Sequence, residues 1–161
     1  MTGQGLWQML RHELGGGFSA TPLPVAALRL CAALVLGGAL GIERQVRHKA
    51  AGLRTHMLIA IAACLFTLIA LDLMALPGDT ATLRTDPLRL IAAVTSGVAF
   101  LAAGTIIFQG DRVHGLTTGA SMWMAGAAGL ACGIGNIPMG ALATALALVV
   151  LEAVRRLEHR G

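Results

Sequence analysis

Long apolar runs and short polar gaps alternate along this chain. Five runs have the length of a membrane span, at residues 25–42, 55–76, 87–108, 116–134 and 137–154. Each holds about 18 to 22 residues, which at 1.5 Å per residue lets a helix cross a hydrocarbon core of roughly 30 Å. Such runs are too long for barrel strands, and backbone groups in lipid must be hydrogen-bonded within their own segment. The pattern therefore predicts helices.

The polar gap at residues 41–55 sets the expected orientation of these helices. It concentrates positive charge, opposed only by Glu43, in the residues Arg44, Arg47, Lys49 and Arg54. Because such segments resist translocation, we expect a cytoplasmic loop here. With this gap inside, eight arginines and lysines fall on the inner side and four on the outer side. The prediction is an all-α integral membrane protein, a bundle of five transmembrane helices with the N-terminus outside and the C-terminus cytoplasmic.

The composition agrees with a membrane protein. The chain is 56% hydrophobic and 12% charged, whereas a soluble domain is about one-quarter charged. The positive-inside bias and anionic lipid head groups account for the net charge of +4, so no nucleic-acid partner is expected. With 21 glycines and 4% aromatic residues, the helices should pack closely through small residues. The expected packing positions are Gly37, Gly41, Gly97, Gly104, Gly129 and Gly133, and exposed glycine stripes also favour a homodimer.

Three regions are expected along the chain. Residues 1–21 form an N-terminal tail or a short interfacial helix, because Arg11, His12 and Glu13 interrupt any signal-peptide core. Residues 22–157 form the transmembrane domain, and residues 158–161 form a C-terminal tail.

Ionisable residues near the outer boundary require partners because charge at membrane depth is costly. They form an expected outer polar cluster of Arg29, Asp72, Asp86 and Arg89. One interpretation is ion pairing with snorkelling of the arginines. The other is a ligand or ion site open to the outside, in which the carboxylates would bind a cation such as magnesium. The flanking arginines oppose tight binding of a cation.

A second set of polar residues gathers at the inner helix ends. This expected inner surface comprises Glu43, Arg44, Arg54, Thr55, Thr117, Thr118 and Glu152. Helix caps, with Thr55 on the second helix and Thr117 or Thr118 on the fourth, and contacts with lipid head groups give one account. A cytoplasmic docking or anion-binding surface gives the other, because helix N-termini and arginines attract negative groups. Asp86 followed by Pro87 should cap the third helix.

Other chemistry has little support in the sequence. The five histidines show no HxxxH or HExxH spacing, and Cys31, Cys64 and Cys132 each stand alone in an apolar run. Ser96 and Ser121 have no adjacent base, and no glycine-rich phosphate loop is present. We expect no enzyme and no cofactor. Metal binding or pH sensing by the inner histidines stays open.

Several motifs, read together, resemble the transmembrane domain of the MgtC/SapB family. The resemblance extends over residues 28–135 and rests on residues 41–55, Asp86-Pro-Leu-Arg89, Ser96-Gly97, Phe100-Leu101, Ala103-Gly104 and Gly115-Leu-Thr-Thr118. It implies functional positions at Glu43, Arg44, Arg54, Thr55, Asp86, Arg89, Gly97, Gly104, Thr117, Thr118 and Trp123. Ala93 stands where family members often have Gln, and Ala99 and Ala102 replace glycines.

The resemblance also implies a function. Family members are multi-pass proteins of the bacterial inner membrane, without established enzymatic activity, linked to growth in low magnesium, survival inside macrophages and inhibition of the ATP synthase. Because the chain ends at Gly161, it resembles the short SapB-type members without the cytoplasmic domain of MgtC. We therefore expect a regulator that binds a membrane partner such as the ATP synthase. The alternative is a small magnesium transporter or channel.

Overall fold

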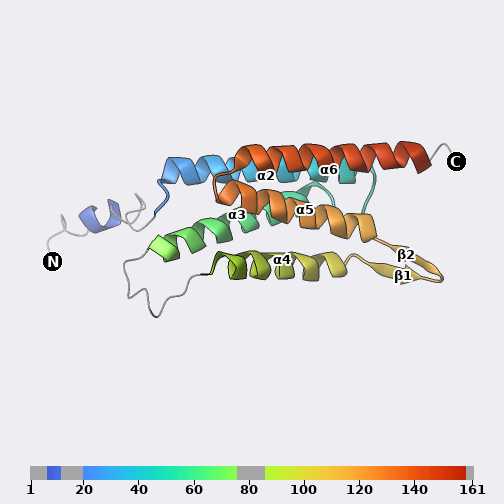
Figure 1. Cartoon of the computed structure of the whole chain (residues 1–161), viewed down its shortest axis with the longest axis horizontal. Coiled ribbons are helices and arrows are strands. Elements are labelled where there is room, and N and C mark those ends of the chain that lie inside the picture. The colour runs from blue at the N-terminus through green and yellow to red at the C-terminus, as the bar shows by residue number, and fades with distance from the viewer. Residues whose placement is uncertain (1–6, 12–19, 76–85, 159–161) are drawn as a thin grey trace.

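The computed structural model of this chain describes residues 7–11, 20–75 and 86–158, and of residues 154–158 it describes the backbone alone. Five long helices run alternately up and down along one axis (Figure 1). They are α2 (Leu23–Val46), α3 (Leu53–Ala75), α4 (Pro87–Ala103), α5 (Leu116–Gly133) and α6 (Ile137–Glu158). A hairpin of β1 (Ile107–Gln109) and β2 (Arg112–His114) joins α4 to α5.

Helix α5 lies at the centre of the bundle. It packs against α2, α3, α4 and α6, whereas α4 packs mainly against α5. Ten residues of α5 are buried, compared with three in α4. Most of the ten are glycine, alanine or serine, so neighbouring backbones approach α5 closely. The core is therefore built from small residues around one helix.

The expected third helix is too long. It was predicted to reach Phe108, but α4 ends at Ala103 and Phe108 lies in β1. The amides of Gly104, Thr105 and Ile106 bond back to carbonyls of the last turn of α4, which closes the helix. Hydrophobicity did not reveal this helix end, because Ile106, Ile107 and Phe108, which follow α4, are also apolar.

The expected loop at residues 41–55 is also shorter than predicted. Helix α2 continues to Val46 and α3 begins at Leu53, so residues 47–52 alone connect them. His48 turns the chain with a φ of 52°, and the amide of Lys49 donates to the carbonyl of Arg44 at 3.1 Å. Glu43 and Arg44 consequently lie on a helix rather than in a loop.

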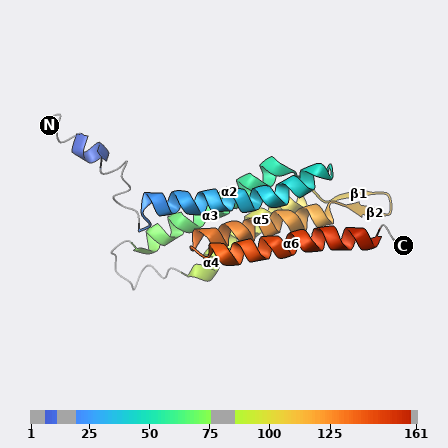
Figure 2. The same ribbon diagram turned by 90° about the horizontal axis from the view of Figure 1, so that it is seen from above.

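Within the described residues, two helices, α2 and α3, are long and apolar enough to cross a membrane, judged by length and composition. The apolar helices Pro87–Ala103 and Ile137–Ala153 are slightly shorter. The α2–α3 turn, the hairpin and the end of α6 lie together at one end of the bundle (Figures 1 and 2), here called the hairpin end.

The expected terminal regions lie mostly outside the described residues. Within residues 1–21, residues 7–11 are helical. Residues 159–161 of the predicted C-terminal tail lie outside, as does Arg84, which was counted on the outer side.

Candidate functional site

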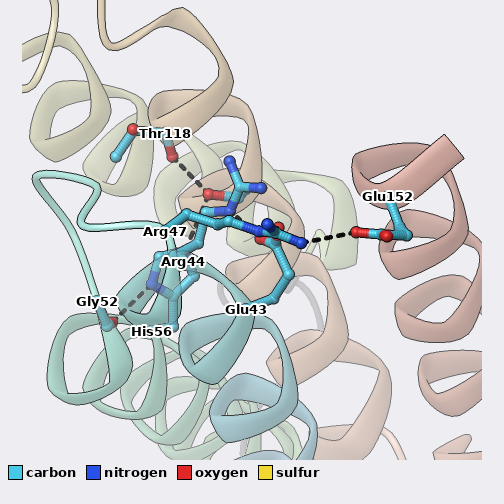
Figure 3. Close-up of polar contacts among 8 residues, drawn as sticks. Glu43, Arg44, Arg47, Gly52, His56, Thr118 and Glu152 are labelled. Carbon is cyan, nitrogen blue, oxygen red and sulfur yellow. Dashed lines mark hydrogen bonds and ion pairs between the residues drawn. The ribbon is translucent and has the colours of Figure 1, made fainter. Parts of the chain in front are cut away.

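Polar side chains from four helices meet at the hairpin end of the bundle (Figure 3). We call this group the polar network. It comprises Glu43 and Arg44 of α2, Arg47 at the C-cap of α2, His56 of α3, Ser121 and the carbonyl of Thr118 of α5, and Glu152 of α6.

Arg44 is the buried cation of the network, with a side chain that is 4% exposed. Its Nε donates to Oε2 of the neighbouring Glu43. The other carboxylate oxygen of Glu43 lies 3.5 Å from Nε of Arg47, one helical turn further along. Burying an isolated charge is costly, so this pairing is what allows Arg44 to be buried at the bundle end.

Arg47 connects α2 to α6. Its Nη2 donates to Oε2 of Glu152 at 2.8 Å (Figure 3), although the two residues are 105 positions apart. Together the two carboxylates and the two guanidinium groups balance in charge. The charged part of the network therefore ties two helices together with no net charge.

His56 forms the neutral part of the network and is fully buried. Its Nδ1 lies 2.8 Å from the carbonyl oxygen of Gly52, and because a carbonyl can only accept, Nδ1 holds the proton. Nε2 lies 2.9 Å from Oγ of Ser121, which also lies 2.8 Å from the carbonyl oxygen of Thr118. The hydroxyl of Ser121 has one proton, and the carbonyl oxygen of Thr118 and Nε2 of the neutral imidazole are its two alternative acceptors. This chain of contacts joins α3 to α5.

The remaining residues of the expected inner surface lie outside the network. Arg54 and Thr117 are exposed and Thr55 is half-buried. The predicted threonine caps are wrong: Oε1 of Gln45 accepts from the amide of Leu53 at the start of α3, and Gly115 is the N-cap of α5. Gly115 has a φ of 91°, and the carbonyl of Thr105 occupies the space that a Cβ would need. A glycine therefore holds this position.

Three of the four residues of the expected outer cluster contact three different segments. Nη1 of Arg29 donates to the carbonyl of Gly133 at 2.8 Å, at the C-terminus of α5, where a cation is favourable. Asp72 accepts from the amide of Ala20 at 2.9 Å. Asp86 accepts from the amide of Leu88 at 2.9 Å and caps α4, as predicted, while Arg89 is exposed in the first turn of the same helix.

The glycines expected at helix contacts divide into two groups. A Cβ on Gly37 or Gly41 would lie within 2.7 Å of atoms of α3, and Gly129 and Gly133 approach α3 equally closely. The structure contradicts the packing role of the other two, because a Cβ on Gly97 would meet no atom within 4 Å and one on Gly104 would meet only carbonyls of α4 itself. These two positions lie on the outside of the bundle, where α4 is an edge helix.

Sequence reasoning missed three of the seven residues of the polar network. Arg47, His56 and Ser121 were not among the predicted site residues. The spacing of Glu43 and Arg47 by four positions was a readable signal for one contact. Within the described residues, no three His, Cys, Asp or Glu side chains lie close enough together to hold a metal ion.

The geometry defines a helical protein with apolar helices of membrane-spanning length and a charge-balanced polar network at one end. Its sequence matches the model of the MgtC family over residues 30–160. The chain belongs to the MgtC family. No solved structure matches it.

Curated relatives agree with this assignment. Over 136 residues the chain is 40% identical to "Protein MgtC" of Brucella abortus (strain 2308), covering 84% of this chain and 54% of the relative. It is 39% identical over 137 residues to "Putative magnesium transporter YhiD" of Escherichia coli (strain K12), covering 83% and 62%. An uncharacterized Synechocystis protein is 41% identical over 130 residues, covering 81% and 52%. The chain thus spans between half and two-thirds of the length of these relatives.

Proposed function

We propose that this protein is a five-helix regulator of the bacterial inner membrane that acts in magnesium homeostasis by binding a membrane partner, without enzymatic activity. Membership of the MgtC family and the apolar helices support a membrane location. In this proposal α2 to α6 each cross the membrane. The hairpin end faces the cytoplasm, because most arginines and lysines of the sequence fall on that side.

One observation favours a regulator over a transporter: the acidic groups of the polar network are turned toward arginines of the same network. Glu43 contacts Arg44 and Arg47, and Glu152 contacts Arg47. A path for a divalent cation needs carboxylates or other oxygens directed at a common point. Here the positive groups occupy the positions that a cation would need, so the network is suited to holding helices in place.

A magnesium transporter is the second candidate. The name of the E. coli relative favours it, and Asp72 and Asp86 both lie near the end of the bundle opposite the hairpin. In that alternative these carboxylates would attract the ion on the outer side.

Magnesium flux into proteoliposomes separates the two candidates. The purified protein is reconstituted with a magnesium-sensitive dye inside the vesicles, with empty vesicles as baseline and a magnesium ionophore as positive control. Asp72→Asn and Asp86→Asn remove charge but keep an oxygen that accepts the amides of Ala20 and Leu88. Flux at baseline is the expected result. Flux above baseline that either variant lowers would establish the transporter.

Complementation tests the regulatory role itself. A bacterial strain that lacks its own MgtC-family gene and grows poorly in low magnesium is given the wild type or Arg54→Glu, which reverses an exposed charge outside the polar network. We expect the wild type to restore growth and the variant to fail at equal protein level. Arg89→Glu, at the opposite end, is the matched control. Equal rescue by all three would contradict partner binding at the hairpin end.

The ATP synthase is the partner that we propose to test first, and a homodimer is the proposed assembly. ATP hydrolysis by inverted membrane vesicles, measured with and without the protein, tests the partner. Cross-linking in the membrane tests the dimer.

A further inference from the structure

The hairpin between α4 and α5 is exposed along its whole length. All six strand residues of β1 and β2 are exposed, and the hairpin projects from the bundle end in both views (Figures 1 and 2). Its turn is formed by Gly110, with a φ of 60°, and Asp111. A glycine with positive φ at the first turn position gives a tight two-residue connection that keeps the strands paired.

The strand register gives the hairpin one apolar face and one mixed face. Phe108 pairs with Val113, and Gln109 pairs with Arg112. Directly opposed residues share one face and successive residues alternate between faces. One face therefore presents Phe108 and Val113, which are 77% and 42% exposed. The opposite face presents Gln109 and Arg112, together with Ile107 and His114.

The base of the hairpin is fixed to the bundle. Thr105 donates its hydroxyl to the carbonyl of Ala102 at 2.8 Å. Gly115, just after β2, lies against the backbone of Thr105 and Ile106. Both strands thus leave the bundle from one tight contact, so the direction of the apolar face is set by the protein.

The length of α4 places this hairpin at a membrane boundary. Its 17 residues span about 26 Å, which is less than a hydrocarbon core of roughly 30 Å. The chain continues from Ala103 into Ile107 and Phe108 within five residues. The apolar side chains of Ile107 and Phe108 extend the apolar length of this segment toward the thickness of the hydrocarbon core. They thereby reduce the mismatch between the short helix and the bilayer.

The exposed positive charge at the hairpin end is suited to contact with an anionic membrane surface. The described, exposed side chains there include three cations, Lys49, Arg54 and Arg112, and one acid, Asp111. Glu43 and Glu152 are engaged with arginines of the polar network. The exposed surface therefore has an excess of positive charge, which attracts anionic lipid head groups.

We propose that the hairpin is a membrane-surface anchor: Phe108 and Val113 insert at the boundary between head groups and acyl chains, and Arg112 contacts the phosphates of anionic lipids. The proposal rests on the membrane embedding of the helices proposed above. Apolar anchors combined with nearby cations are the usual means by which a surface segment binds an anionic bilayer.

Tryptophan fluorescence in vesicles tests the depth of each face. Trp7 and Trp123 are first replaced by Phe, and a single tryptophan is introduced as Phe108→Trp, Val113→Trp or Gln109→Trp. Vesicles contain phosphatidylcholine and phosphatidylglycerol, with bromine near the carbonyl end of the acyl chains as quencher. Phe66→Trp, at a position of α3 that is 55% exposed, reports on the embedding of the helices.

We expect brominated lipid to quench Phe108→Trp, Val113→Trp and Phe66→Trp, and aqueous iodide to quench Gln109→Trp. Iodide quenching of Phe108→Trp, with Phe66→Trp quenched by lipid, overturns the anchor and leaves the embedding intact. Protection of Phe108→Trp from both quenchers means that protein covers the face, which also overturns the anchor. Failure of lipid to quench Phe66→Trp overturns the membrane embedding and the anchor with it.

The lipid preference of the site tests the role of Arg112. In the Phe108→Trp protein, brominated phosphatidylcholine beside the hairpin quenches the tryptophan, and unbrominated phosphatidylglycerol that replaces it restores the fluorescence. The recovery of fluorescence at a given lipid ratio gives the relative affinity of the two lipids for this site. We expect Arg112→Gln to lower the preference for phosphatidylglycerol about fivefold, the effect of one surface cation. Arg89→Gln, at the other end of the same helix–hairpin segment, should leave it unchanged. An unchanged preference in Arg112→Gln would refute the contact with anionic lipid.

Discussion

Gly41 of α2 lies so close to α3 that a methyl group has no room there. A Cβ at this position would be 2.6 Å from Cα of Leu53, 3.0 Å from its carbonyl oxygen and 3.1 Å from Cβ of His56. Ordinary contacts between such atoms are about 3.5–4.0 Å, so α2 and α3 would have to separate by about 1 Å. Two of the three obstructing atoms are backbone, so no side-chain rotation relieves the clash.

The magnitude for Gly41→Ala follows from two opposing effects. Overpacking a close contact costs about 1–3 kcal/mol, and alanine in place of glycine within a helix regains about 0.5–1 kcal/mol. We expect a net loss of about 0.5–2 kcal/mol in the free energy of unfolding.

Reversible unfolding in mixed micelles, followed by far-UV circular dichroism, measures this loss. Gly97→Ala is the matched control, because a Cβ there meets nothing within 4 Å. In that variant only the helix-propensity gain should remain. A Gly41→Ala protein as stable as Gly97→Ala would refute the close α2–α3 contact.

Three further predictions concern single polar contacts. A double-mutant cycle on Arg47→Gln and Glu152→Gln should give a coupling free energy of about 0.2–1 kcal/mol, because both side chains are partly exposed. A coupling of zero would mean that this ion pair does not stabilise the contact between the end of α2 and α6. Asp86→Ala should cost about 0.5–2 kcal/mol of stability through the lost cap, whereas Asp86→Asn should cost little; equal losses would contradict capping. Ser121→Ala should cost about 1–3 kcal/mol, because it leaves Nε2 of the buried His56 without its polar partner; an unchanged unfolding midpoint would contradict a stabilising role for this contact.

The order of the helices and the positions where they begin could be predicted from hydrophobicity, because an apolar run of this length favours a helix, which satisfies its own backbone hydrogen bonds. Helices α2, α3, α5 and α6 all begin within two residues of the predicted positions. The prediction failed at Phe108, where an apolar strand follows an apolar helix. It also failed at Glu43 and Arg44, because charges that pair with one another do not force a helix to end.

The site was harder to predict than the helices. Glu43, Arg44 and Thr118 were identified from local charge and from family resemblance, but the Arg47–Glu152 contact joins residues 105 positions apart. Such a pair depends on how α2 and α6 cross, and no periodicity within either helix encodes that. Likewise, His56 and Ser121 meet only because small residues let α3 approach α5.

The central position of α5 has a consequence for biosynthesis. A chain leaves the ribosome from its N-terminus, so α2, α3 and α4 are complete before α5 exists. Helices α2 and α3 can pair at once, since they contact each other directly, but α4 finds its main neighbour only when α5 follows. Until then the face of α4 with Val94, Val98 and Ala102 is not covered by α5. An insertion factor that shelters a nascent helix would be needed most during the synthesis of residues 104–133, and release of the sheltered helix would coincide with the emergence of α5.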